Sequence, residues 1–151
     1  MISQTAEYAL RAIFFMAEHS EKSHVTQQIA DGTRVPVGYL AKVLQGLHKA
    51  GLVNAQRGLG GGFTLARPST SISVYDVVQA VDPIQRIHTC PLKLTSHGTN
   101  LCPLHRHLDD VMAKIEEEFK KHSVAQLLAQ PSTSRPLCPF PFPVPNRPSK
   151  P

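Results

Sequence analysis

The chain has few cysteines and no long apolar run, and both absences narrow its class. Three cysteines in 151 residues are too few for the disulfide framework of a small secreted domain. The most apolar N-terminal stretch, Ala9 to Ala17, is interrupted by Arg11 and is far shorter than the ~20 residues that cross a bilayer. It also lacks the basic start, apolar middle and cleavage site of a signal peptide. We therefore expect a cytoplasmic protein without a membrane partner.

The remaining composition describes a basic globular domain with a tail. Apolar residues make up 41% of the chain, as in ordinary folded domains. Eight of the thirteen prolines lie in residues 131–151, where we expect a disordered, extended tail. Residues 1–67 hold seven lysines and arginines against four aspartates and glutamates, a net +3, whereas residues 68–130 hold six against seven, a net −1. A basic N-terminal half suggests a polyanionic partner.

The apolar pattern predicts a mainly α fold with one small β-hairpin. Helical spacing indicates helices over residues 3–19, 26–34 and 36–50, the second capped by Thr26 and the third opened by Pro36. Leu52 to Gln56, the glycine-rich RGLGGG and Phe63 to Leu65 read as a hairpin.

Two further helices are expected after the hairpin. The first covers Val74 to Val81, with Ser73 and Asp76 in a capping-box pattern. The second is a long helix of about 25 residues within 104–130, longer than the N-terminal part can cover. Its excess apolar face predicts packing on a second copy of the chain. That face comprises Leu104, Leu108, Val111, Met112, Ile115 and Phe119.

Helix, short helix, turn, helix and hairpin is the order of a winged helix-turn-helix, which we assign to residues 1–82. A recognition helix needs small residues where it enters the major groove and polar or basic ones behind them, and a glycine-rich hairpin tip lets backbone approach phosphates. Taken one at a time, each motif is also explained by a solvated amphipathic helix or a tight turn. The candidate DNA-binding residues are Thr26, Pro36, Gly38, Tyr39, Lys42, Gln45, Lys49, Arg57, Gly58 and Gly60.

A second group of residues has metal-ligand chemistry. His88-x-Cys90 and Cys102-x-x-His105-x-His107 flank or fall in a segment without periodicity, residues 83–103. Thiolate and imidazole suit zinc, copper and iron–sulfur clusters. Spacing alone leaves a metal site and solvated loop histidines equally open. A small metal-dependent hydrolase is an alternative, although no HExxH or HxE…PCxxC pattern is present.

Five segments of the chain together have a recognisable pattern: EYALRAIFFMA, VPVGYLAKVLQGLHKAGLV, RGLGGGFTLARP, VYDVVQAVD and CPLHRHLDD. Through these segments the chain resembles the Rrf2 family of bacterial transcriptional regulators over about residues 1–128. The resemblance implies a homodimer that binds double-stranded DNA at an inverted repeat, probing it with two winged helix-turn-helix units. It also implies that the long helices cross to form the dimer interface, and that the protein acts as a repressor.

Family members that sense redox state or nitric oxide hold an iron–sulfur cluster in the loop before the long helix. Cys90 and Cys102 match the first and third of the three cysteines in that pattern, and Ser96 stands in the middle position. His105 and Glu7 match ligand positions of some members, Glu7 being contributed by the partner subunit. The resemblance thus implies a [2Fe–2S] cluster on Cys90, Cys102, His105 and Glu7. The alternative is the same DNA-binding regulator with zinc or an unknown effector instead of a cluster.

Overall fold

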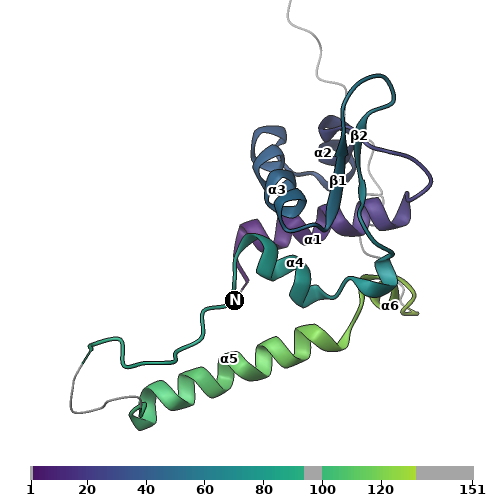
Figure 1. Cartoon of the computed structure of the whole chain (residues 1–151). Coiled ribbons are helices and arrows are strands. Elements are labelled where there is room, and N and C mark those ends of the chain that lie inside the picture. The colour runs from purple at the N-terminus through teal and green to yellow at the C-terminus, as the bar shows by residue number, and fades with distance from the viewer. Residues whose placement is uncertain (1, 94–99, 132–151) are drawn as a thin grey trace, which may run out of the picture.

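The computed structural model describes residues 2–93 and 100–131. In this part of the chain, helices are joined to one two-stranded sheet (Figure 1). This confirms the predicted mainly α class with a single hairpin. The elements are α1 Gln4–Glu18, α2 Thr26–Thr33, α3 Val37–Lys49, β1 Val53–Gln56, β2 Gly62–Leu65, η1 Ser69–Ser71, α4 Val74–Val81, α5 Pro103–Lys121 and α6 Val124–Leu128.

Helix α1 forms the centre of the hydrophobic core. One of its faces is rich in alanine and so lets other helices approach closely, and the helix contacts α2, α3, α4 and α6. Burial of these apolar faces supplies most of the folding free energy. Figure 1 shows α2, α3 and the hairpin on one side of α1 and α4 and α5 on the other. The fully buried large side chains include Ile13, Met16, Ile29, Leu40, Leu44, Leu47, Ile72 and Val77.

Helix α2 begins one residue differently from the prediction. Thr26 is its first helical residue, and the N-cap is Val25. Valine has no side-chain acceptor, so the Gln28 side chain satisfies this end instead by accepting from the Val25 N–H at 3.0 Å. The assignment of Thr26 as N-cap was therefore wrong. By contrast, the capping box of Ser73 and Asp76 at the start of α4 is confirmed.

The long C-terminal helix is shorter than the predicted ~25 residues. It spans 19 residues and ends at Lys121, and the separate helix α6 starts at Val124. The chain is extended at the break, where Val124 N–H donates to the Ile72 carbonyl at 2.8 Å. Ser123 then caps α6 by accepting from the Gln126 N–H. The Val124–Ile72 bond, together with the bond from the Val74 N–H to the His122 carbonyl at 3.3 Å, attaches the end of α5 to the segment before α4.

The hairpin is antiparallel and is extended by a third short segment. Val53 pairs with Leu65 and Gln56 with Gly62. On the other edge of β2, Phe63 exchanges two backbone hydrogen bonds of 2.8 and 3.0 Å with His24. His24 itself is buried and its Nε2 lies 2.8 Å from the His19 carbonyl oxygen. The turn between α1 and α2 therefore supports the outer edge of β2 next to the hairpin tip.

Candidate nucleic-acid interface and metal site

Helix α3 has one buried and one exposed face. Its apolar side chains, including Leu40, Leu44 and Leu47, face the core. The opposite face is exposed and carries the predicted contact residues Gly38, Lys42, Gln45 and Lys49. Pro36 is the N-cap, and its carbonyl accepts from the N–H groups of Tyr39 and Leu40. The exposed side of α3 thus has Gly38 between the exposed Val37 and Tyr39 at its start, and polar and basic side chains further along.

Tyr39 differs from its predicted neighbours because its polar group already has a partner. Its hydroxyl forms a hydrogen bond with the Thr5 hydroxyl. Its ring lies edge-on to Tyr8, with 5.4 Å between ring centroids. These contacts hold the start of α3 against the start of α1, and Tyr39 as a whole remains 39% exposed. The sequence reasoning missed this tie, since nothing local in the sequence links residues 34 positions apart.

The hairpin tip is exposed and contains two glycines in an unusual backbone conformation. Gly58 and Gly60 have φ of 95° and 75°, in the left-handed region that favours glycine. The Ser23 hydroxyl donates to the Gly60 carbonyl at 2.6 Å and so holds the tip from the α1–α2 turn. Leu59 between these glycines is fully exposed, and Arg57 at the base of the tip is exposed too. Figure 1 shows the hairpin beside α3 on the same side of α1.

Two of the predicted metal ligands meet in the structure. Cys102 is the N-cap of α5, and His105 lies one turn later. The Cys102 Sγ and the His105 Nδ1 are 3.3 Å apart. Two donors on one tetrahedral ion, at ~2.3 Å for sulfur and ~2.1 Å for nitrogen, would be separated by about 3.6 Å. The pair therefore has the chemistry and nearly the spacing of half a metal site.

The other two predicted ligands do not join this pair within one chain. Cys90 is buried at 5% exposure, and Glu7 forms an ion pair of 2.6 Å with Arg11 one turn along α1. Among the described residues, no group of three or more His, Cys, Asp or Glu side chains is placed to hold a metal ion. Ser96 lies outside the described residues.

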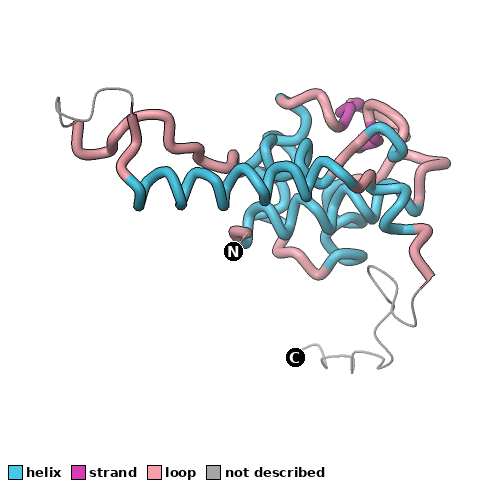
Figure 2. Tube along the Cα trace, turned by 90° about the horizontal axis from the view of Figure 1, so that it is seen from below, coloured by secondary structure: helices cyan, strands magenta, loops and turns pink. Residues whose placement is uncertain are grey.

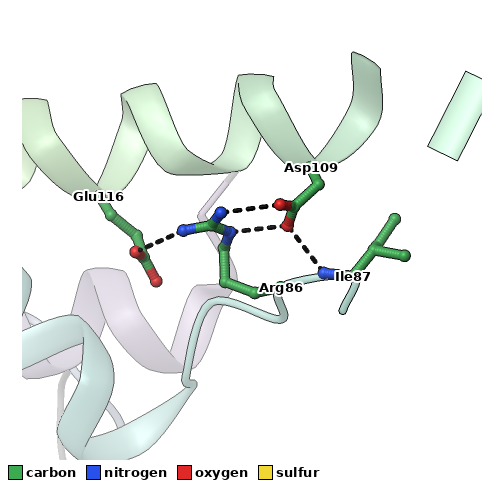
Figure 3. Close-up of polar contacts among 4 residues, drawn as sticks. All are labelled: Arg86, Ile87, Asp109 and Glu116. Carbon is green, nitrogen blue, oxygen red and sulfur yellow. Dashed lines mark hydrogen bonds and ion pairs between the residues drawn. The ribbon is translucent and has the colours of Figure 1, made fainter. Parts of the chain in front are cut away.

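A polar network that the sequence reasoning missed connects the Cys90 segment to α5 (Figure 3). The Arg86 guanidinium donates two bonds of 2.7 Å to the Asp109 carboxylate and a third of 3.3 Å to Glu116. The Ile87 N–H donates to the same Asp109 at 2.8 Å. Arg86 first, and then this N–H, hold the pKa of Asp109 well below its usual range, and Asp109 raises the pKa of Arg86. Both groups therefore stay charged across the physiological pH range.

These features define a class of protein. An exposed polar helix placed beside a glycine-tipped hairpin, in the observed order of elements, is a winged helix-turn-helix, a DNA-binding unit. No described helix is both long and apolar enough to cross a bilayer. Residues 2–130 match the Rrf2 family, described as an iron-dependent transcriptional regulator, and the chain belongs to that family. The family consists of regulators rather than enzymes, which decides against the hydrolase alternative.

Individual relatives agree with this assignment. The HTH-type transcriptional regulator IscR of Vibrio vulnificus (strain YJ016) is 30% identical over 129 residues, covering 85% of this chain and 77% of the relative. The T. potens IscR structure is 26% identical with a TM-score of 0.66, covering 85% of each chain. The structure of CymR, the global cysteine regulator of B. subtilis, has a TM-score of 0.68 at 22% identity and covers 84% of this chain and 95% of its own. The CymR likeness shows the shared fold.

Proposed function

We propose that this regulator binds an inverted-repeat operator as a homodimer and acts as a repressor. The observation that carries the proposal is the common placement of the exposed α3 face and the glycine-tipped hairpin on one side of α1. In the proposed complex, the start of α3 enters the major groove, and Arg57 reaches a phosphate or the adjacent minor groove. The excess of cations in residues 1–67 favours this approach electrostatically.

The exposed apolar side chains of α5 are the argument for the proposed homodimer. Of its 19 residues, only Glu116 is buried within the described chain. Leu104, Leu108 and Val111 are exposed and spaced at i, i+4 and i+7, so they form one apolar stripe. We propose that the same stripe of a second copy covers it, because a two-fold axis places identical faces against each other. The symmetry of such a dimer sets the symmetry of the operator.

The DNA-binding proposal is tested by selecting a high-affinity duplex from random sequences and measuring its affinity at several salt concentrations. Arg57→Ala is expected to weaken binding and to lower the slope of log K against log salt by about 0.9, the value for one lost phosphate contact. Arg106→Ala is the matched control, since Arg106 is an exposed cation on α5. Equal slopes for the wild type and Arg57→Ala would remove the hairpin from the interface. Transcription from a promoter that contains the selected site tests repression.

We further propose that DNA binding responds to a metal centre at the Cys102–His105 pair. A [2Fe–2S] cluster requires four protein ligands, and among the described residues no more than two of the four predicted ligands, Cys102 and His105, come together. The donor chemistry fits, with mixed thiolate and imidazole ligation raising the potential of such a cluster. In the proposed centre, Cys90 of the same chain and Glu7 contributed by the second subunit complete the set. The signal would then be redox state or nitric oxide acting on that centre.

The metal proposal is tested by purifying the protein without oxygen and measuring its visible spectrum and its iron, sulfide and zinc contents. Iron with sulfide supports the cluster, and zinc alone supports the alternative regulator. His105→Ala is expected to lose the metal, whereas His107→Ala, which alters an exposed side chain two residues away, retains it. A colourless wild-type protein without either metal would refute the metal centre and leave the DNA-binding proposal intact.

A further inference from the structure

The turn between α1 and α2 approaches the second strand of the hairpin very closely. In both views the two strands lie at the margin of the helical part of the molecule (Figures 1 and 2). A Cβ on Gly62, where β2 begins, would lie 2.7 Å from the carbonyl carbon and oxygen of His24. Any side chain there would displace one of the two backbones, so this approach requires glycine. With the His24–Phe63 backbone pair on one edge and β1 on the other, β2 is paired on both edges.

His24 is in turn fixed to the end of α1. It is buried, and its ring Nε2–H donates to the carbonyl of His19, the C-cap of α1, at 2.8 Å. The ring also lies edge-on to Phe15 of α1, with 5.2 Å between ring centroids. A side chain that is both hydrogen-bonded and packed leaves its own backbone little freedom to move. His24 therefore fixes the position of β2 relative to α1.

Ser23 extends this attachment to the hairpin tip, residues 57–61. Its hydroxyl donates to the Gly60 carbonyl at 2.6 Å, a bond between residues 37 positions apart. Inside the tip, the Gly61 N–H donates to the Gly58 carbonyl at 2.9 Å. Among the described residues, the Ser23 bond is the one hydrogen bond that joins the tip to anything outside the hairpin. Because glycine-rich backbone has wide conformational freedom, this bond is what restricts the tip.

We propose that Ser23 is a positioning residue for DNA binding, whose hydroxyl holds the hairpin tip where Arg57 meets the DNA backbone. The inference rests on the proposed DNA-binding function and adds a residue that does not itself touch DNA. A tip that is ordered before binding loses less conformational freedom in the complex, so this order raises the affinity. The net contribution of one hydrogen bond corresponds to about a two- to tenfold change in Kd.

The first test needs no DNA. The ¹⁵N relaxation of the backbone amides at Gly58 and Gly60 gives their order parameters. We expect about 0.85 in the wild type, as in rigid backbone, and below about 0.6 in Ser23→Ala. Ser23→Thr keeps the hydroxyl and should keep the wild-type values. Ser71→Ala is the matched control, since it removes a serine-to-carbonyl bond of 2.9 Å outside the hairpin. Equal order parameters in the wild type and Ser23→Ala overturn the proposal.

The second test is a double-mutant cycle with the selected duplex. Ser23→Ala is expected to raise Kd about two- to tenfold in the wild-type background. It should have little further effect in the Arg57→Ala background, because Ser23 acts through the contact that Arg57 makes. A merely structural role would weaken binding by the same factor in both backgrounds, and that result contradicts the proposal. A wild type that binds no duplex refutes the proposed function, whereas the relaxation measurement still decides whether Ser23 holds the tip.

Discussion

Gly38 lies on the exposed face of α3, and Gly38→Ala adds one methyl group there. We expect this methyl group to raise the stability of the fold and to weaken DNA binding, so the two effects can be measured separately. A Cβ built at Gly38 meets nothing within 4 Å. Alanine restricts the unfolded chain more than glycine does, so Gly38→Ala is expected to raise the free energy of unfolding by roughly 0.5–1 kcal/mol. In the proposed complex the same methyl stands where the helix enters the groove. Overpacking a close interface costs about 1–3 kcal/mol, which is about a 5- to 150-fold increase in Kd.

The two effects are measured on the same protein preparation. Urea unfolding followed by circular dichroism gives the stability, and fluorescence anisotropy with the selected duplex gives the affinity. Binding to an unrelated duplex is the control, because contacts to phosphates alone would weaken both complexes equally. A more stable variant that binds the selected duplex as tightly as the wild type would show that Gly38 does not approach DNA. A less stable variant would contradict the open surroundings of Gly38 in the fold.

Three further predictions follow from contacts elsewhere in the chain. Gly32→Ala places a Cβ 2.2 Å from a ring carbon of Phe15. The free energy of unfolding measured in urea should fall by about 1–2 kcal/mol, because this overpacking outweighs the better helix propensity of alanine. A stabilised variant would contradict the α1–α2 packing. Leu108→Asp puts charge into the exposed α5 stripe and should yield monomers by light scattering, and a persistent dimer would exclude that stripe as the interface. The pKa of Asp109 lies below the usual ~3.9 of an aspartate in the unfolded chain, so the ionised carboxylate stabilises the fold above that pH, and this stabilisation is lost as the pH falls toward the lower folded pKa. The free energy of unfolding of Asp109→Asn should therefore fall less steeply than that of the wild type between about pH 4 and pH 2. An equal slope in the two proteins would argue against the Arg86 network.

The fold was predictable wherever the sequence carries a local periodic signal. Helical spacing located α1 and α3, the glycine-rich turn located the hairpin, and the capping box located α4. The break at residues 122–123 was missed because the apolar stripe continues through it. Ser123 and Gln126 do form a capping-box pattern that marks the start of a new helix. The chain turns there because Val124 bonds to Ile72, and that contact spans 52 positions, beyond any local pattern.

The features of the candidate sites were likewise predictable only where they depend on residues close together in the sequence. The exposed α3 face follows directly from the helical period, and the Cys102–His105 contact follows from their spacing of three on one helix. Arg86 lies in a stretch without period, and its partners are 23 and 30 positions away. Nothing local distinguishes such an arginine from a solvated one. The tie between Tyr39 and Thr5 is hidden for the same reason.

Helix α4 connects the candidate metal ligands on α5 with α3, the proposed recognition helix. A Cβ on Gly46 of α3 would lie 3.3 Å from a methyl of Val81, so the last residue of α4 packs directly on α3. Arg86 follows Val81 by five residues and is fixed to α5. The contacts thus form a continuous series from α5 through Arg86 and the end of α4 to α3. Helix α4 also packs against α1, so a displacement of α4 would act on the core around α1 as well as on α3.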